Sequence, residues 1–366
     1  MSTKQPFDGM EKVQHFFSSG YPEQSSIMAQ QFVPADEWVV EIMSQGLSSY
    51  LVLFVMGLLC SIVSLPLLYT LFRSPRLRAD SKLITCLAVG DMINCLALCV
   101  MGYARYELYT QGMKTGMVPL ETSQTCAGKP YMWLRLIGNV WPPTVQLVMG
   151  IERTLACWTP VFFVNHIRKR SLHACILSVL IVLLFCLIGV VVAFTSKEDD
   201  YVKFDCGRKA TFSYAYGQVL YCFEIAGYVI GLVLNAIAYF RCRLILCNDA
   251  AQEQLKRIRY YLAIATISTV LVALPNAKQL LLDHLKTAGL DEWLSQSFNW
   301  LSLIASSLNI FVYLILNREF RSEFCNVFST RRITKVSIIP VQFNSGGAQP
   351  SPLKEIKTVF IITSQY

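Results

Sequence analysis

The chain is organised around one stretch, Gln146-Leu-Val-Met-Gly-Ile-Glu-Arg-Thr-Leu-Ala-Cys-Trp-Thr-Pro160. It begins as an apolar helix and ends on an acid-base pair, Glu152 and Arg153, with a basic run beyond it at 166–170. A charged pair at the end of a membrane helix must be solvated, paired or held for a purpose. The basic run is typical of the cytoplasmic side of a membrane. The pair is therefore predicted to lie where a membrane helix meets the cytoplasm, either as an ordinary interfacial pair or as a switch.

The composition indicates a protein with several membrane-spanning helices. Of its 366 residues, 54% are hydrophobic and only 15% are charged, whereas soluble domains carry about 25% charged residues. The Lys and Arg residues behind the net charge of +8 cluster in the short loops between apolar runs, so this charge does not indicate a nucleic-acid partner. We find no nucleophile–base pair, metal cluster or phosphate-binding loop, so we expect neither an enzyme nor a cofactor or metal.

Seven apolar stretches are each long enough to cross a lipid bilayer, which takes about 20 residues. We place them at 47–72, 82–106, 130–157, 172–194, 213–240, 257–282 and 294–316. All are expected to be helices, because lipid offers no hydrogen-bond partners to a bare backbone. The predicted fold is an all-α bundle over 47–328, with tails over 1–46 and 329–366.

The loops predict the orientation of the bundle in the membrane. Basic residues gather in the loops after the first, third and fifth stretches and after the seventh, whereas an alternate loop is acidic at 197–200. By the positive-inside rule the N-terminus is extracellular and the C-terminus cytoplasmic. We expect a multi-pass protein of the plasma membrane.

Three motifs resemble the rhodopsin-like family of G-protein-coupled receptors, in a divergent branch that is peptide-receptor-like or chemosensory-like. They are Leu87-Ala-Val-Gly-Asp91, Ile151-Glu-Arg-Thr-Leu-Ala156 with Pro160, and Ser307-Leu-Asn-Ile-Phe-Val-Tyr313 followed by Leu316-Asn-Arg-Glu-Phe-Arg-Ser-Glu-Phe324. The resemblance covers about 47–328 and implies a seven-helix bundle with a short amphipathic eighth helix. It also implies a receptor that binds an extracellular peptide or a non-aminergic small molecule and activates a heterotrimeric G protein.

The resemblance assigns the G-protein coupling switch to Glu152, Arg153, Tyr239, Asn309 and Tyr313. Arg153 is expected to pair with Glu152 at rest and to turn toward the G protein on activation. Pro275 is expected to kink the sixth helix and act as its hinge, because proline lacks an N–H group.

Asp91 is a carboxylate in the middle of an apolar helix and therefore needs partners. Its candidate neighbours are Ser306 and Asn309. The resemblance implies that this polar core helps to set the inactive state, and that it can hold a sodium ion. Pro142 and Pro143 stand where family members often supply a polar sodium ligand. We therefore favour a structural and switching role for Asp91 over an ion site.

The ligand pocket is expected to open outward between the third, fifth, sixth and seventh helices. Its polar candidates are Arg135, Asn139, Glu224, Lys278, Gln279 and Asn299. An arginine at position 135 disfavours a cationic amine, because like charges repel. Two interpretations are open: Arg135 and Lys278 hold an anionic group of the ligand, or Arg135 pairs with Glu224 as an internal strut.

Two cysteines, Cys126 and Cys206, are predicted to form an extracellular disulfide, because both lie in loops placed outside the cell; the family shares this bond. Cys325, on the expected eighth helix, is a candidate for palmitoylation, with a free thiol as the equal alternative. Tail residues such as Ser329 and Thr330 are candidates for phosphorylation and recognition by arrestin.

Two other functions compete with a peptide receptor. The nearer one is a chemosensory receptor for small environmental molecules. The more distant one is a small-solute transporter, which is disfavoured because the helices offer little of the polar path that a solute needs.

Overall fold

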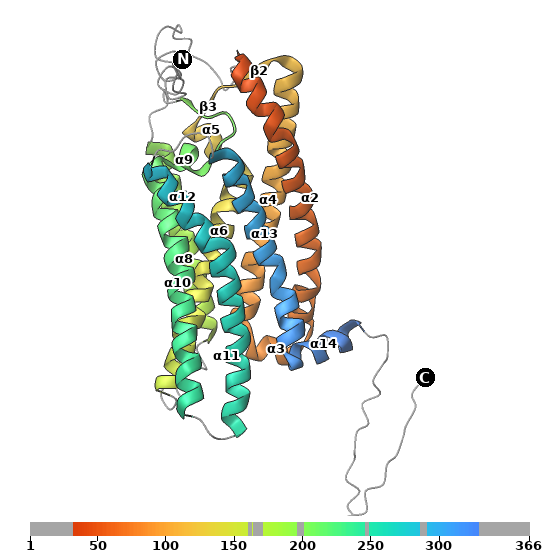
Figure 1. Ribbon diagram of the computed structural model, residues 1–366, viewed down its shortest axis with the longest axis vertical. Coiled ribbons are helices and arrows are strands. Elements are labelled where there is room, and N and C mark those ends of the chain that lie inside the picture. The colour runs from red at the N-terminus through yellow and green to blue at the C-terminus, as the bar shows by residue number, and fades with distance from the viewer. Residues whose placement is uncertain are drawn as a thin grey trace, which may run out of the picture.

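The computed structural model describes 32–159, Phe163, 171–195, 201–245, 249–285 and 291–328. Within this part of the chain, seven long helical segments stand side by side as one bundle (Figure 1). They are α2 (Glu37–Arg73), α4 (Lys82–Thr115), α6 (Pro130–Trp158), α8 (Ser171–Thr195), α10 (Tyr214–Ile245), the run of α11 (Asp249–Ser268), η3 (Thr269–Ala273) and α12 (Leu274–Leu285), and α13 (Asp291–Leu316). The predicted seven-helix fold is confirmed.

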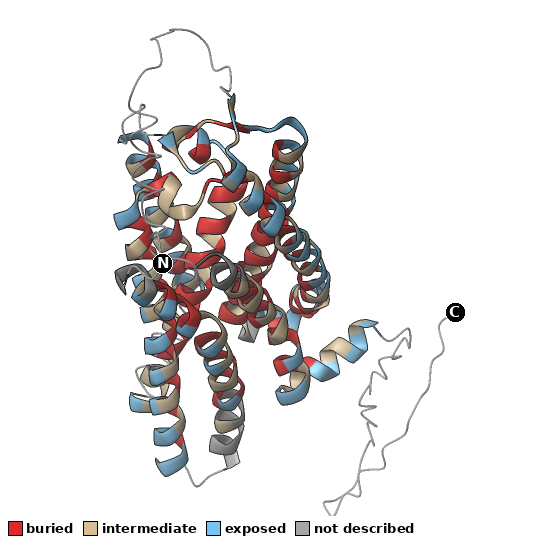
Figure 2. Cartoon of the chain, turned by 45° about the horizontal axis from the view of Figure 1, so that its top comes forward, coloured by how far each residue is buried: buried red, intermediate tan, exposed pale blue. Residues whose placement is uncertain are grey.

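Six of these segments are long and apolar enough to cross a membrane, and α6 is the one that falls outside this set. It carries Arg135, Glu152 and Arg153, and it is enclosed by α4, α8 and α10. The outer faces of the bundle are exposed and apolar, as on α8, where Leu183, Leu187 and their neighbours face outward. Figure 2 shows buried residues gathered toward the inside of the bundle. Exposed leucines are stable in lipid and not in water, so the chain is a multi-pass membrane protein.

Short elements cover one end of the bundle, which we call the lid end (Figure 1). They are β1 (Phe32–Pro34), β2 (Met117–Pro119), β3 (Glu121–Thr122), α5 (Ser123–Ala127), β4 (Tyr201–Val202) and α9 (Arg208–Phe212). Two antiparallel pairs link them: β1 with β2, where Phe32 faces Pro119, and β3 with β4, where Glu121 faces Val202.

Two helices mark the opposite end, which we call the α14 end. They are α3 (Pro75–Asp80), between α2 and α4, and α14 (Arg318–Phe328), which follows α13. The side chain of Ser74 accepts a hydrogen bond from the Leu77 amide and so caps α3.

The predicted N-terminal boundary at residue 46 is wrong, because α2 begins at Glu37. Charged residues such as Glu41 conceal this part of the helix in a hydropathy pattern. In the structure Val39 and Met43 are buried, and Met43 lies against Gly112 of α4, where an added Cβ atom would come within 2.8 Å of the Met43 sulfur. The rest of the predicted tail, 1–31, lies outside the described residues.

The sixth helical segment changes its winding just before Pro275. The five residues of η3 form a π-helical turn, in which the Leu274 amide donates to the Thr269 carbonyl. Pro275 follows directly and is buried. A proline removes a backbone donor and clashes one turn back, and a wider turn accommodates both effects. This turn ends at Ala273, just before Pro275; the kink at Pro275 and its action as a hinge stay predictions.

Candidate ligand cavity and switch region

A cavity lies toward the lid end among α4, α6, α10, α12 and α13, with α9 contributing one side chain. Its polar lining residues are Asn94, Arg135, Asn139, Arg208, Tyr221, Glu224, Tyr228, Asn276, Gln279, Asn299 and Ser302. The space is small, about 30 Å³, which is room for about two water molecules. Five of the six residues predicted for the pocket therefore line one cavity. Lys278 does not line it, because its position on α12 turns the side chain outward, where it is exposed.

Arg135 is the central cation of this cavity and is only 6% exposed. Its Nη1 donates to the side-chain oxygen of Asn94, at 3.0 Å, and its Nη2 donates to that of Asn299, at 2.7 Å. Both partners are neutral amides. Arg135 is thus held in place by α4 and α13, and no carboxylate of the described part of the chain bonds to it.

Glu224 does not form the strut with Arg135 that one of the two open interpretations required. One of its oxygens accepts a hydrogen bond from Nη1 of Arg208, at 2.8 Å, and the other accepts from Asn276, at 2.7 Å. Arg208 also lies over the ring of Tyr221, with its guanidinium carbon 4.5 Å from the ring centre. The carboxylate is engaged by the lid residue Arg208, so Arg135 has no directly bonded counter-ion within the residues that the structure describes.

A continuous hydrogen-bonded path leads from Arg135 toward the middle of the bundle. Asn94, which accepts from Arg135, donates to the hydroxyls of Ser302 and Ser306, at 3.1 and 3.3 Å. One turn away, Asn309 donates to Asp91 at 2.6 Å, and Ser306 also interacts with that carboxylate. The predicted polar core of Asp91, Ser306 and Asn309 is therefore assembled, and it adjoins the cavity through Asn94.

Close packing of two helices keeps this path in register. A Cβ atom placed on Gly138 of α6 would lie 2.7 Å from the Cα atom of Asn94 on α4. Real Cβ atoms do not approach backbone this closely, so only glycine permits the contact. Gly138 thus lets Asn94 come close enough to receive the bond from Arg135.

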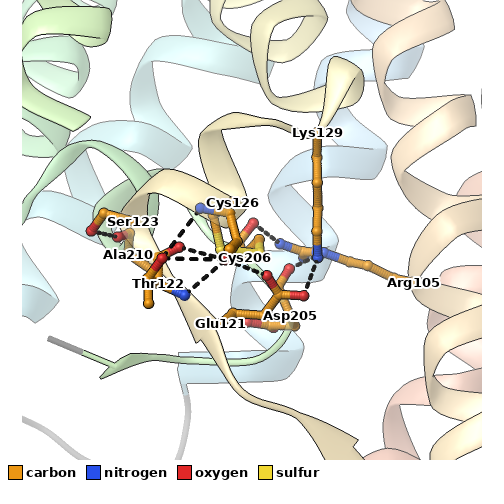
Figure 3. The surroundings of a disulfide bond; sticks show 10 residues. Arg105, Glu121, Thr122, Ser123, Cys126, Lys129, Asp205, Cys206 and Ala210 are labelled. Carbon is orange, nitrogen blue, oxygen red and sulfur yellow. Dashed lines mark hydrogen bonds and ion pairs between the residues drawn. A yellow bond between two sulfur atoms is a disulfide. The ribbon is translucent and has the colours of Figure 1, made fainter. Parts of the chain in front are cut away.

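The predicted disulfide between Cys126 and Cys206 is present and joins α5 to the segment before α9. Figure 3 shows its surroundings. Arg105 of α4 donates to the carbonyls of Asp205 and Cys206, both at 3.1 Å, and also to the hydroxyl of Tyr50. Cys206 has a φ of 49°, which residues other than glycine rarely adopt. The disulfide and Arg105 together hold the strained backbone from which Arg208 reaches the cavity.

Charges at the lid support this arrangement. Burial alone would raise the pKa of the Asp205 carboxyl, but the nearby Lys203 ammonium, at 3.4 Å, and Arg105 outweigh it and lower the pKa below its usual value. Also near the disulfide, Lys129 pairs with the buried Glu121 at 2.7 Å (Figure 3).

Arg153 lies near the α14 end, but the predicted pair with Glu152 is not formed. Its Nη2 donates to the hydroxyl of Tyr261 on α11, at 2.8 Å, and its guanidinium lies over that ring, 4.4 Å from the centre. Consecutive helical residues point in directions about 100° apart, so Glu152 and Arg153 do not face each other. Tyr261 fixes Arg153 across the α6–α11 boundary instead.

The tyrosine predicted on α10 is not part of this contact. Tyr239 stacks edge-on against Phe240, whereas the described contacts of the Arg153 side chain are with Tyr261. Tyr313 of α13 is fully buried and lies edge-on to Tyr260, with ring centres 5.9 Å apart. Tyr260 in turn contacts Tyr261, at 4.4 Å between ring centres. A row of rings therefore links Arg153 to the end of α13.

The row of rings continues onto α14. Phe320 is buried beside Tyr313, and Phe324 and Phe328 follow on the same helix face. Cys325 is exposed and carries a free thiol; its palmitoylation, like a membrane-surface role for α14, stays a prediction. Ser329 and Thr330 lie outside the described residues.

Sequence reasoning missed four residues that complete these sites: Asn94, Arg208, Asn276 and Tyr261. Arg208 had a usable signal, since it stands two residues after Cys206 and the disulfide fixes it over the cavity. Asn94 lies three residues after Asp91, on nearly the same helix face. Asn276 and Tyr261 offered no comparable signal, because their roles depend on how α11 and α12 rotate against their neighbours.

Comparison with known families decides the class of the chain. Residues 58–328 match the family described as serpentine-type seven-transmembrane GPCR chemoreceptor Srsx. The chain belongs to this family. The family is one of chemoreceptors, so it supports the chemosensory alternative over a peptide receptor. None of the curated proteins compared with the chain matches it.

Proposed function

We propose that this member of the Srsx family is a plasma-membrane chemoreceptor that senses a small extracellular molecule and activates a heterotrimeric G protein. The lid end faces the outside of the cell, as the distribution of basic loops favours. The family description supports a chemoreceptor, and the small volume of the cavity, about 30 Å³, favours a small ligand over a peptide. The rhodopsin-like motifs support coupling to a G protein at the α14 end.

One observation carries this proposal: the cavity and the polar core share a hydrogen-bonded path. Arg135 in the cavity bonds Asn94, and Asn94 bonds Ser306 beside Asp91. A ligand that changes the position of Arg135 therefore changes the partners available to Asn94 and the polar core. Below that core, Arg153 is held by Tyr261. Such an arrangement has two states, and a ligand shifts their balance by binding one state more tightly.

The test is guanine-nucleotide exchange on a panel of G proteins, in membranes that carry the receptor and receive pools of small molecules. The wild type is expected to respond to at least one pool, and Arg153→Ala is expected to lose that response. Arg73→Ala is a matched control, because it removes an exposed arginine at the same end of the bundle. Equal responses in wild type and Arg153→Ala would reject the role given to Arg153.

A further inference from the structure

The cavity carries one more positive charge than its described residues neutralise. Its charged lining residues are Arg135, Arg208 and Glu224, which sum to a formal charge of +1 if all three are ionised. Glu224 attracts both arginines but uses both oxygens for Arg208 and Asn276. Lys278, the residue before Gln279 on α12, is exposed and does not line the cavity. The excess charge therefore resides on Arg135.

A buried charge without an ionic partner is unfavourable, since two amide oxygens replace only part of the water that it loses. Arg135 uses two N–H groups, toward Asn94 and Asn299, and a guanidinium has five. Three of its donors are left for another group. The site is built for an acceptor that this part of the chain does not supply.

A second, independent observation points to the same kind of ligand. The side chain of Asn139 lines the cavity and is only 8% exposed, and its Nδ2 has no hydrogen-bond partner among the described residues. Asn139 lies four residues after Arg135 on α6, so both side chains project from one face of the helix. A buried amide without a partner is costly, and a ligand oxygen would satisfy it. The unused N–H groups on this face of α6 therefore belong to the guanidinium of Arg135 and to the neutral amide of Asn139.

We propose that the ligand of this cavity is a small organic monoanion, with a carboxylate bound by Arg135 and Asn139. The proposal rests on the proposed function and names the class of molecule that this receptor senses. A carboxylate fits because its two oxygens match the parallel N–H groups of a guanidinium. One negative charge suffices to neutralise Arg135. A cationic ligand is excluded by the same charge, and a neutral ligand leaves it uncompensated.

The direct test is thermal denaturation of the purified full-length receptor with a panel of small sodium carboxylates: formate, acetate and propionate. Each acid is compared with its primary amide at matched ionic strength. At least one acid is expected to raise the melting temperature of the wild type more than its amide does, because a ligand stabilises the state that it binds. In Arg135→Gln the affinity for that acid is expected to fall roughly 10- to 150-fold, the loss of hydrogen bonds to a charged group.

The matched control is Lys278→Gln, which removes the same charge from an exposed position near the cavity and is expected to respond like the wild type. Asn139→Ala tests the site without touching Arg135, and about tenfold weaker acid binding is expected. The proposal is overturned if no acid stabilises the wild type more than its amide. It is also overturned if Arg135→Gln keeps the acid preference or, should that variant not fold, if Asn139→Ala binds acid as the wild type does.

This assay contains no G protein, so it separates the two proposals. Acid binding without nucleotide exchange would reject the signalling function and leave the ligand class standing. Exchange driven only by neutral molecules, with no acid binding, would reject the ligand class and leave the chemoreceptor standing.

Discussion

Arg153 donates a hydrogen bond to the hydroxyl of Tyr261, 2.8 Å away, while its neighbour Glu152 makes no ion pair with it. The contact joins α6 to α11, the helix that continues through the π-helical turn to Pro275. It therefore holds together two helices whose separation would open the α14 end. Tyr261, rather than Glu152, is the residue that the half-buried Arg153 contacts in this structure.

The first prediction concerns that contact. Tyr261→Phe keeps the ring over Arg153 but removes the hydroxyl, so the contact that holds Arg153 against α11 becomes weaker. A hydrogen bond to a charged group contributes about 1.5–3 kcal/mol, and the retained cation–π contact reduces the loss. Basal nucleotide exchange without ligand is expected to rise by up to about tenfold. Tyr239→Phe is the control and is expected to leave basal exchange unchanged; a rise in the control instead would restore the original assignment of the switch.

A second prediction follows from the close approach of α4 and α6. Gly138→Ala places a methyl group against the backbone of Asn94, and overpacking of this kind costs about 1–3 kcal/mol. The variant is expected to melt at a lower temperature and to bind any cavity ligand more weakly, because Asn94 moves away from Arg135. Gly189→Ala is the comparison, since its added Cβ would meet its nearest neighbour at an ordinary 3.4 Å. Equal stability of the two variants would argue against the close contact.

A third prediction concerns the lid. Arg105→Met removes the donor to the Asp205 and Cys206 carbonyls, and each buried acceptor left without a partner costs about 1–3 kcal/mol. The melting temperature of the purified receptor is expected to fall clearly. Lys114→Met, on an exposed position of the same helix, is expected to change little. A stable Arg105→Met variant would show that the disulfide alone holds the lid.

The fourth prediction is a pH dependence set by Asp205. Its carboxyl has a lowered pKa in the folded state because Lys203 and Arg105 outweigh the effect of burial, whereas an unfolded aspartate titrates at about 3.9. The stabilisation is therefore complete above that value and is lost as the pH falls through the lower, folded pKa. Melting temperatures below about pH 4 should drop more steeply for the wild type than for Asp205→Asn. Parallel curves for the two proteins would contradict the assignment.

Much of the fold was predictable because hydropathy and length decide it. Seven apolar stretches gave seven helical segments, and the two loop cysteines gave the disulfide. The start of α2 was missed, since Glu37 and Glu41 break the apolar pattern while Met43 packs on α4. A hydropathy pattern reflects the polarity of each residue, but it does not show whether a residue packs against a neighbouring helix.

The candidate sites were only partly predictable, because pairing between helices depends on their rotation. The contact between Asp91 and Asn309 followed from the motifs on their two helices. The position of Arg135 in the cavity followed from its place along α6. The true partners of Arg153 and Glu224 lie on other elements, at Tyr261 and Arg208. Lys278 shows the same limit. Its place along α12 suggested that it lines the cavity, but its side chain points outward and is exposed.

The central claim is that the cavity communicates with the α14 end through the polar core, and Asp91→Asn tests it most directly. The substitution keeps the shape of the side chain and does not alter a cavity-lining residue. Binding and nucleotide exchange are measured on the same membranes, with the small-molecule pool that activates the wild type. The account predicts binding within about twofold of the wild type and exchange reduced by about tenfold or more, the loss expected when a charged hydrogen-bond partner of Asn309 becomes neutral. Wild-type exchange in Asp91→Asn would contradict the claim.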